Sequence, residues 1–200
     1  MRLYIVANLD KVKDYTLFAP LTKKGLSDSK KLTKILRKLN ITHLYCSPYV
    51  NALQTIYPYA KKRNLSVAID YSLVDHIKDY LVAKKSYNNE LPKYIEKRFK
   101  SSENYKSATH HMNLKYNESN NDLHQRLRNI LRQIIINHSK KDDNVLIISH
   151  KIPINAIMKI GSNSHHTNIP KDYPSNYDYP DGGITKIFDK DKWSFDKINW

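Results

Sequence analysis

The chain has 200 residues, of which 40% are hydrophobic and 26% are charged, and this composition excludes a disordered chain and fits one globular domain. Lysine and arginine number 34 against 19 for aspartate and glutamate, which gives a net charge of +15. The lysines are dispersed and form no block of about five or six like charges. We therefore interpret the charge as compositional drift rather than as a polyanion-binding tail.

The cysteine content and the hydropathy pattern bear on localisation. The single cysteine, Cys46, excludes an internal disulfide framework and suits a reducing compartment. No apolar run approaches the length of a membrane span, and charged residues follow the short apolar run at 3–6 too soon for a signal peptide. We expect a cytoplasmic protein that does not enter a membrane.

Short apolar runs and segments with helical spacing alternate along the N-terminal part of the chain. The expected elements are, in order, a strand at 3–6, a helix at 26–39, a strand at 44–46, a helix at 53–60 and a strand at 66–69. Ser27 or Asp28 is expected to cap the first of these helices, because a short polar side chain there accepts a hydrogen bond from a first-turn amide.

A polar stretch separates these elements from those of the C-terminal part. Residues 84–121 are rich in lysine, asparagine, serine and tyrosine, so they predict an insertion over the core, helical near Tyr94 to Phe99. The elements expected after it are a helix at 123–135 capped within 119–122, a strand at 145–148, a helix at 154–160, a loop at 162–180 and strands at 184–188 and 193–198.

Strands that alternate with helices indicate βαβ units. The sequence therefore predicts an α/β fold, a three-layer sandwich in which helices flank a mostly parallel central sheet, as one domain over residues 1–200. Ligands of such sheets bind beyond the carboxyl ends of the strands. Those ends are Ala7-Asn8, Ser47 and Ser149-His150, so we expect these residues to line any site.

Six segments carry short motifs in a fixed order along nearly the whole chain. They are Pro20–Gly25 with Asp28, Ser29 and Leu32, then Cys46–Thr55, Leu73–Asp75, Glu118–Arg126, Ile147–His150, and last Gly183-Ile184 with Trp193 and Ile198-Asn199. As a set, and not one by one, these segments resemble the motifs of the histidine phosphatase superfamily. The resemblance implies a phosphoglycerate mutase-like fold.

The resemblance also implies a site and a chemistry. In this family a histidine after the first strand attacks phosphorus, two arginines and a second histidine bind the phosphoryl oxygens, and a carboxylate protonates the leaving oxygen, without a metal ion. Here Asn8 stands at the nucleophile position, and Ala7 and Asn51 stand at the arginine positions. His150 and Asp75 match the second histidine and the carboxylate. The resemblance thus implies a family scaffold that lacks its nucleophile and its arginines.

Three functions are open from the sequence. We favour a catalytically inactive binding or interaction protein, in which Asp75 is vestigial and the partner is an unidentified protein or a phosphorylated ligand. One alternative is an atypical phosphatase or phosphomutase in which Asp75 and His150 activate a water. The other is a basic protein that binds nucleic acid or another polyanion, because 15 tyrosines interleave with lysines, although no nucleic-acid motif supports it. The oligomeric state is left open.

Two further sites are disfavoured. Cys46 or Ser47 could act as a substitute nucleophile with His150 as base, but Cys46 reads more simply as a small buried hydrophobe. The pairs His110-His111 and His165-His166 lie in polar stretches without the spacing of a metal site. We expect neither a metal ion nor a cofactor.

Overall fold

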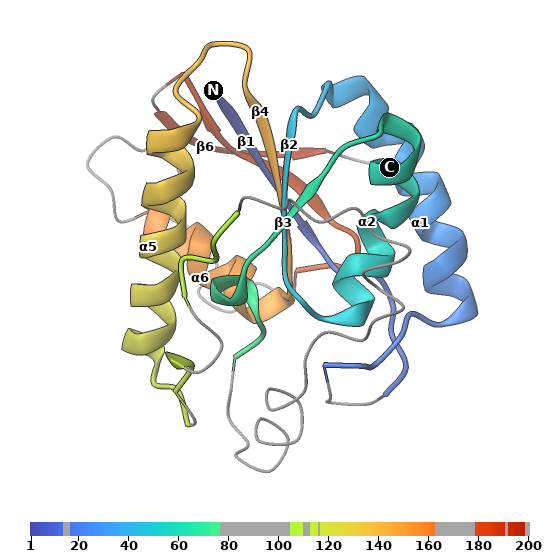
Figure 1. The fold of residues 1–200 in the computed structure, drawn as a ribbon, viewed down its shortest axis with the longest axis horizontal. Coiled ribbons are helices and arrows are strands. Elements are labelled where there is room, and N and C mark those ends of the chain that lie inside the picture. Colours follow the sequence, from blue (N-terminus) through green and yellow to red (C-terminus); the bar gives the residue numbers. More distant parts are fainter. Residues whose placement is uncertain are drawn as a thin grey trace.

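A central sheet organises the part of the chain that the computed structural model describes, which is residues 1–13, 17–76, 105–109, 113–115, 117–162, 179–190 and 192–198 (Figure 1). Within these residues the sheet has six strands in the order β3-β2-β4-β1-β5-β6. The strands are β1 (Arg2–Ala7), β2 (His43–Cys46), β3 (Val67–Ile69), β4 (Asn144–Ser149), β5 (Ile184–Asp189) and β6 (Lys192–Ile198). The first four run parallel, whereas β5 is antiparallel to β1 and β6 to β5. The predicted mostly parallel α/β sheet is confirmed.

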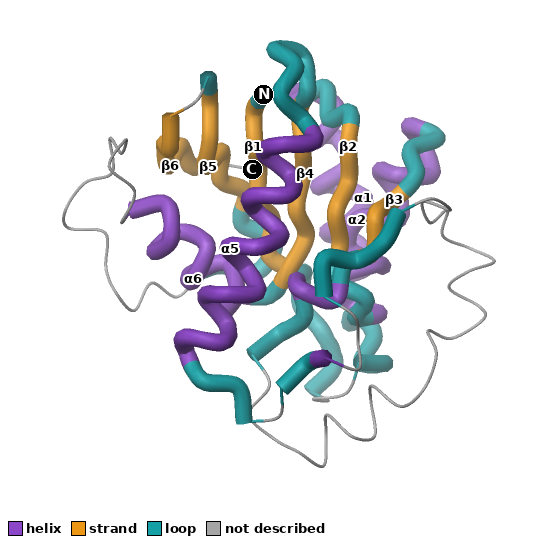
Figure 2. Tube along the Cα trace, turned by 60° about the vertical axis from the view of Figure 1, so that its left-hand side comes forward, coloured by secondary structure: helices purple, strands orange, loops and turns teal. Residues whose placement is uncertain are grey.

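Helices cover both faces of this sheet (Figure 2). The helices are α1 (Lys23–Leu36), α2 (Val50–Arg63), α5 (Asn120–Asn137) and α6 (Lys151–Ser162), with short 3-10 turns η1 (Arg37–Leu39) and η2 (Tyr71–Leu73). Side chains of α1 and α2 belong to one core cluster, and side chains of α5 and α6 belong to another. The sheet between these clusters makes the three-layer arrangement.

The central strands β1 and β4 supply both cores, because successive side chains of a strand point to opposite faces. Leu3 and Ile5 of β1 and Ile147 of β4 pack toward α5 and α6. Val6 and Ile148, one residue further along, pack toward α1 and α2. All five side chains are fully buried. This two-sided burial explains why the strands are almost continuously apolar in the sequence.

The start of α1 corrects the expected helix cap. Thr22, not Ser27 or Asp28, is the N-cap residue, and its hydroxyl accepts a hydrogen bond from Gly25 N over 3.0 Å. The apolar spacing begins only after the first turn of α1, so the periodicity placed the start of the helix too late. At α5, Ser119 and Asp122 form the expected cap as a reciprocal capping box.

A close backbone approach explains the glycine that follows Thr22. Thr22 N donates to Asp10 O over 3.0 Å, and its hydroxyl donates to the Asp10 carboxylate over 2.7 Å. A Cβ on Gly25 would overlap the carbonyl oxygen of Asp10. Only glycine therefore lets the first turn of α1 lie against the segment that leaves β1.

The insertion expected at 84–121, its helix near Tyr94 to Phe99 and the loop expected at 162–180 fall largely outside the described residues. Together with the single-domain boundaries, they stay predictions. In the described ranges, no helix is both long enough and apolar enough to cross a membrane.

Candidate functional site

The carboxyl ends of β1, β2 and β4 lie together at one edge of the sheet. Backbone pairing continues one residue past two of these strands, because Asn8 N donates to Ser149 O and Ser47 N donates to Ile148 O, each over 2.9 Å. His150 follows β4 directly and opens α6. The sheet thus carries Asn8, Ser47 and His150 to the same edge, as strand ends of a parallel sheet require.

His150 makes its hydrogen bond inside the protein. Its Nε2 lies 2.8 Å from Ser47 Oγ, and the two side chains are 2% and 0% exposed. The ring of Tyr49 stands edge-on to the imidazole, with 4.5 Å between ring centroids. Among the described residues, His150 Nδ1 has no hydrogen-bond partner. The ring is therefore buried, with one of its two nitrogens hydrogen-bonded.

Burial sets the charge of this imidazole. Desolvation lowers the pKa of His150 to about 4, opposed by the Asp75 carboxylate and assisted by the positive charges of Lys11 and Arg126. The ring is therefore neutral at pH 7. A neutral imidazole offers one donor and one acceptor but no positive charge to a phosphoryl group.

Asn8 and Ala7, which the motif resemblance matches to the nucleophile and the first arginine, are packed and bonded to the chain. Asn8 is 6% exposed, and its amide Nδ2 donates to Leu9 O over 3.0 Å. Ala7 is fully buried, and its backbone exchanges hydrogen bonds with Gly182 and Gly183. The Asn8 amide nitrogen is delocalised into its carbonyl, so it supplies no nucleophilic lone pair.

Asn51, which the motif resemblance matches to the second arginine, lies in the first turn of α2. It is fully buried, and its Nδ2 donates to Ala19 O over 3.1 Å. Its Oδ1 has no partner among the described residues. Thr55 links the helix to the segment that follows β1, because its hydroxyl donates to Asn51 O over 2.8 Å and accepts from Leu9 N over 3.1 Å.

Arg126 of α5 holds the segment that carries Asp75. Its guanidinium forms a bidentate ion pair with Glu118, with Nη2 2.9 Å from Oε2, and both side chains are buried. The same guanidinium donates to the carbonyl oxygens of Ser72, Val74 and Asp75. Sequence reasoning matched Glu118 and Arg126 to a motif without a role for either, and the structure shows an anchor for the turn after β3.

The Asp75 carboxylate is partly exposed and bonds locally. Its Oδ1 accepts from His76 N over 2.9 Å. Its charge acts on His150, since it opposes the lowering of the histidine pKa. The structure thus brings Ser47 and His150 into contact, places Asn8 beside Ser149, and sets Asp75 within electrostatic range of the imidazole. Asn51 bonds to Ala19 instead.

A cavity of about 670 Å³ lies apart from these residues, between α1 and the β5–β6 edge. Its lining includes Lys24, Lys31, Asp181, Thr185 and Lys197. None of the five predicted site residues lines it. This cavity is therefore not the one that the strand ends define.

The fold and the strand-end site define the class of protein. The family model for the histidine phosphatase superfamily (branch 1) matches residues 9–200, so the chain belongs to this superfamily. The match begins directly after Ala7 and Asn8. The resemblance leads one to expect an arginine at position 7 and the reactive histidine at position 8. No curated protein sequence matches the chain.

Solved structures show the same fold. The ecdysone phosphate phosphatase of Bombyx mori, in complex with tungstate, has a TM-score of 0.72 and 12% identity, over 100% of this chain and 92% of that one. A phosphoglycerate mutase from Bacillus anthracis has a TM-score of 0.68 and 14% identity, over 99% and 92%. A mycobacterial glucosyl-3-phosphoglycerate phosphatase has a TM-score of 0.64 and 15% identity, over 100% and 97%. At these identities the likeness concerns the fold.

Proposed function

We propose that this chain is a histidine-phosphatase-fold protein that has lost phosphoryl transfer and acts by binding. The observation that carries the proposal is the side chain at the nucleophile position: Asn8 is buried and its amide is hydrogen-bonded to Leu9 O. Without a nucleophile, the covalent phosphoryl intermediate of the family cannot form.

Electrostatics supports the same conclusion. Charge-assisted hydrogen bonds contribute about 1.5–3 kcal/mol each, and an arginine supplies two. Replacing both arginines by Ala7 and Asn51 therefore removes on the order of 5 kcal/mol or more from phosphate binding. The neutral His150 adds no positive charge, and the Asp75 carboxylate repels a phosphoryl dianion.

The scaffold motifs are intact while the anion-binding groups are replaced. Thr22 still caps α1, Gly25 still meets Asp10, and Arg126 still pairs with Glu118. Random decay would affect both sets alike, so we infer that the fold serves recognition of a protein or a phosphorylated ligand. The single buried Cys46 fits a reducing compartment such as the cytoplasm.

Hydrolysis assays test this proposal. We expect no turnover of p-nitrophenyl phosphate or of sugar phosphates, and no acid-labile phosphoryl label on the protein. Turnover that survives repurification and disappears in His150→Ala would overturn the proposal, because a contaminating phosphatase would not respond to that variant.

An atypical phosphatase is the second candidate, and the contact between Ser47 and His150 is the observation that favours it. A hydroxyl 2.8 Å from an imidazole nitrogen is the geometry of a nucleophile with its base. Ser47 is fully buried, however, and a histidine with a pKa of about 4 is a weak base. Turnover lost in Ser47→Ala but kept in Asp75→Asn would identify this route.

A further inference from the structure

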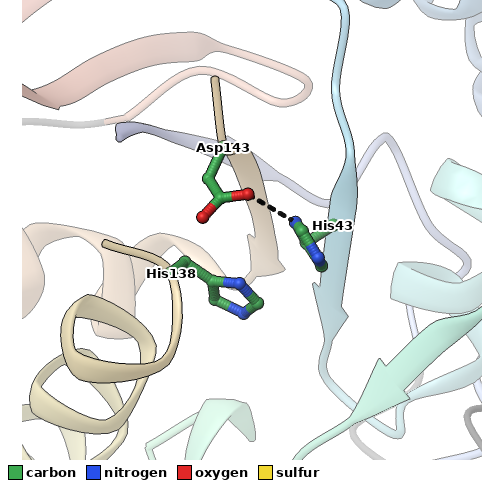
Figure 3. Close-up of side chains that lie close together, drawn as sticks. All are labelled: His43, His138 and Asp143. Atoms are coloured by element: carbon green, nitrogen blue, oxygen red, sulfur yellow. Dashed lines mark ion pairs between the residues drawn. The ribbon is translucent and has the colours of Figure 1, made fainter. Parts of the chain in front are cut away.

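Three side chains of metal-binding type, those of His43, His138 and Asp143, lie close together (Figure 3). They lie at the amino ends of the parallel strands, opposite to His150. His43 is the first residue of β2, Asp143 directly precedes β4, and His138 is the C-cap residue of α5. Because β2 and β4 are parallel neighbours, with His43 paired to Val145, their amino ends lie side by side. The three residues come from three separate elements and converge on one point.

The spacing of these side chains suits a tetrahedral ion. His43 Nδ1 lies 3.9 Å from Asp143 Oδ1, and the two imidazole centroids are 4.0 Å apart. One ligand atom from each residue lies within 4.8 Å of the others. Nitrogen and oxygen ligands of tetrahedral zinc are about 3.3 Å apart, given bonds of about 2.0 Å. Small side-chain rotations therefore bring the three atoms to bonding distance.

In two of the three residues, a neighbouring group already bonds the side-chain atom that would not face the metal. His138 Nε2 lies 2.7 Å from Tyr45 OH, which leaves Nδ1 as the nitrogen available to a metal. Asp143 Oδ2 accepts from Lys140 N over 3.1 Å, which leaves Oδ1, the oxygen that faces His43. Such outer partners fix the tautomer and the orientation of metal ligands.

A metal ion can bind His43 Nδ1 without leaving the neighbouring Thr42 hydroxyl unpaired. Thr42 Oγ1 lies 2.9 Å from His43 Nδ1 and 3.1 Å from Asn144 O. If a metal takes the lone pair of His43 Nδ1, the Thr42 hydroxyl still has the Asn144 carbonyl as acceptor. His43 is also partly exposed, at 42% of its side chain, so an ion can reach the site from solvent.

We propose that His43, His138 and Asp143 bind one divalent transition-metal ion, with zinc as the preferred ion. Water completes the coordination of the metal. Two imidazoles and one carboxylate suit zinc, whereas magnesium and calcium prefer sites made of oxygen alone. The ion ties the end of α5 to the starts of β2 and β4. It lies at the amino edge of the sheet, so its role is to stabilise the fold rather than to assist chemistry at the carboxyl edge.

Equilibrium zinc binding to the chelator-treated full chain tests the proposal. The parent for the measurement replaces His110, His111, His165 and His166 by alanine, so that the two histidine pairs do not contribute. We expect one zinc per chain, bound at least tenfold more weakly after His138→Ala, His43→Ala or Asp143→Asn. Cobalt in place of zinc should give the visible absorption of a tetrahedral site in the parent but not in these three ligand variants.

Matched controls come from the same elements. His124→Ala on α5 and Asp142→Asn beside Asp143 should leave zinc affinity unchanged. Zinc should also raise the thermal midpoint of the parent and of both controls, but not that of Asp143→Asn. Equal affinity in the parent and in all three ligand variants, or an equal loss in the controls, would overturn the site.

Discussion

Ser47 Oγ lies 2.8 Å from His150 Nε2, and this hydrogen bond joins the residues that follow β2 and β4. Neither side chain is open to solvent. The bond uses Nε2 of the imidazole, and the neutral pair has no need of a counter-charge. The histidine that the motif resemblance matches to the family's site is thereby held as part of the core.

Ser47→Ala removes the only hydrogen bond that the described residues give to the imidazole of His150. A buried polar group left without a partner costs about 1–3 kcal/mol, so we expect the free energy of unfolding to fall by that amount. Urea denaturation followed by circular dichroism measures it. Ser27→Ala, on the exposed face of α1, is the matched control and should change stability by less than about 0.5 kcal/mol.

Stability should fall in mild acid because of His150. Its pKa is about 4 in the folded protein against an ordinary 6.5, so between these pH values the unfolded chain binds a proton that the folded one does not. The free energy of unfolding therefore has its full value above pH 6.5 and declines toward pH 4, by roughly 3 kcal/mol in all at 1.36 kcal/mol per pKa unit.

The comparison with His150→Gln isolates this contribution. Burial also lowers the pKa of His124 and His138, so the wild-type slope has more than one source. Subtracting the urea-derived stability curve of His150→Gln should leave a decline confined to pH 4–6.5. Parallel curves for the two proteins across that window would contradict a buried neutral His150.

The strand ends of the site were predictable, and the contacts between them were not. Apolar runs located β1, β2 and β4, and the parallel-sheet rule then placed Asn8, Ser47 and His150 at one edge. The Ser47–His150 bond depends on β2 and β4 being neighbours, an order that strand spacing does not encode. The site roles of Ala7, Asn8, Asn51, Asp75 and His150 all stay predictions.

Side-chain hydrogen bonds between segments far apart in the sequence could not be predicted from local patterns either. Arg126 was recognisable as a motif member, but its bonds to Ser72, Val74 and Asp75 join segments that share no periodicity. His43 and Asp143 likewise meet only because the sheet order sets β2 beside β4. Local patterns predict elements, whereas sheet order decides which polar groups meet.

Arg126→Ala should be among the most destabilising single changes in the described part of the chain. It leaves the Glu118 carboxylate buried without its partner and removes the donor to three carbonyl oxygens. Breaking a buried ion pair costs about 3–5 kcal/mol, so we expect a loss of that size in urea denaturation. Arg128→Ala, exposed on the same helix, is the control and should be close to neutral. A loss below about 1 kcal/mol for Arg126→Ala would show that the pair does not hold the turn after β3.

Restoring the missing groups tests whether the phosphate site was lost only through its side chains. In the triple variant Ala7→Arg, Asn8→His and Asn51→Arg, two fully buried positions receive larger side chains. Overpacking a buried position costs about 1–3 kcal/mol, so we expect the variant to be less stable than the wild type. Its two guanidinium groups would also lie in the core without counter-charges. An oxyanion that binds between them supplies those charges and stabilises the folded state, by about 2.7 kcal/mol at a hundredfold excess over Kd.

Tungstate should therefore raise the thermal midpoint of the triple variant and leave that of the wild type unchanged. Asn8→His alone should not respond, because an imidazole without the arginines leaves the dianion unneutralised. Phosphoryl transfer depends mostly on positioning and charge stabilisation, so a variant that binds tungstate should also take a phosphoryl label on residue 8. A folded triple variant with no response to tungstate would mean that positions 7 and 51 no longer face a common pocket. The binding site for the partner or ligand would then have to lie elsewhere on the basic surface of the protein.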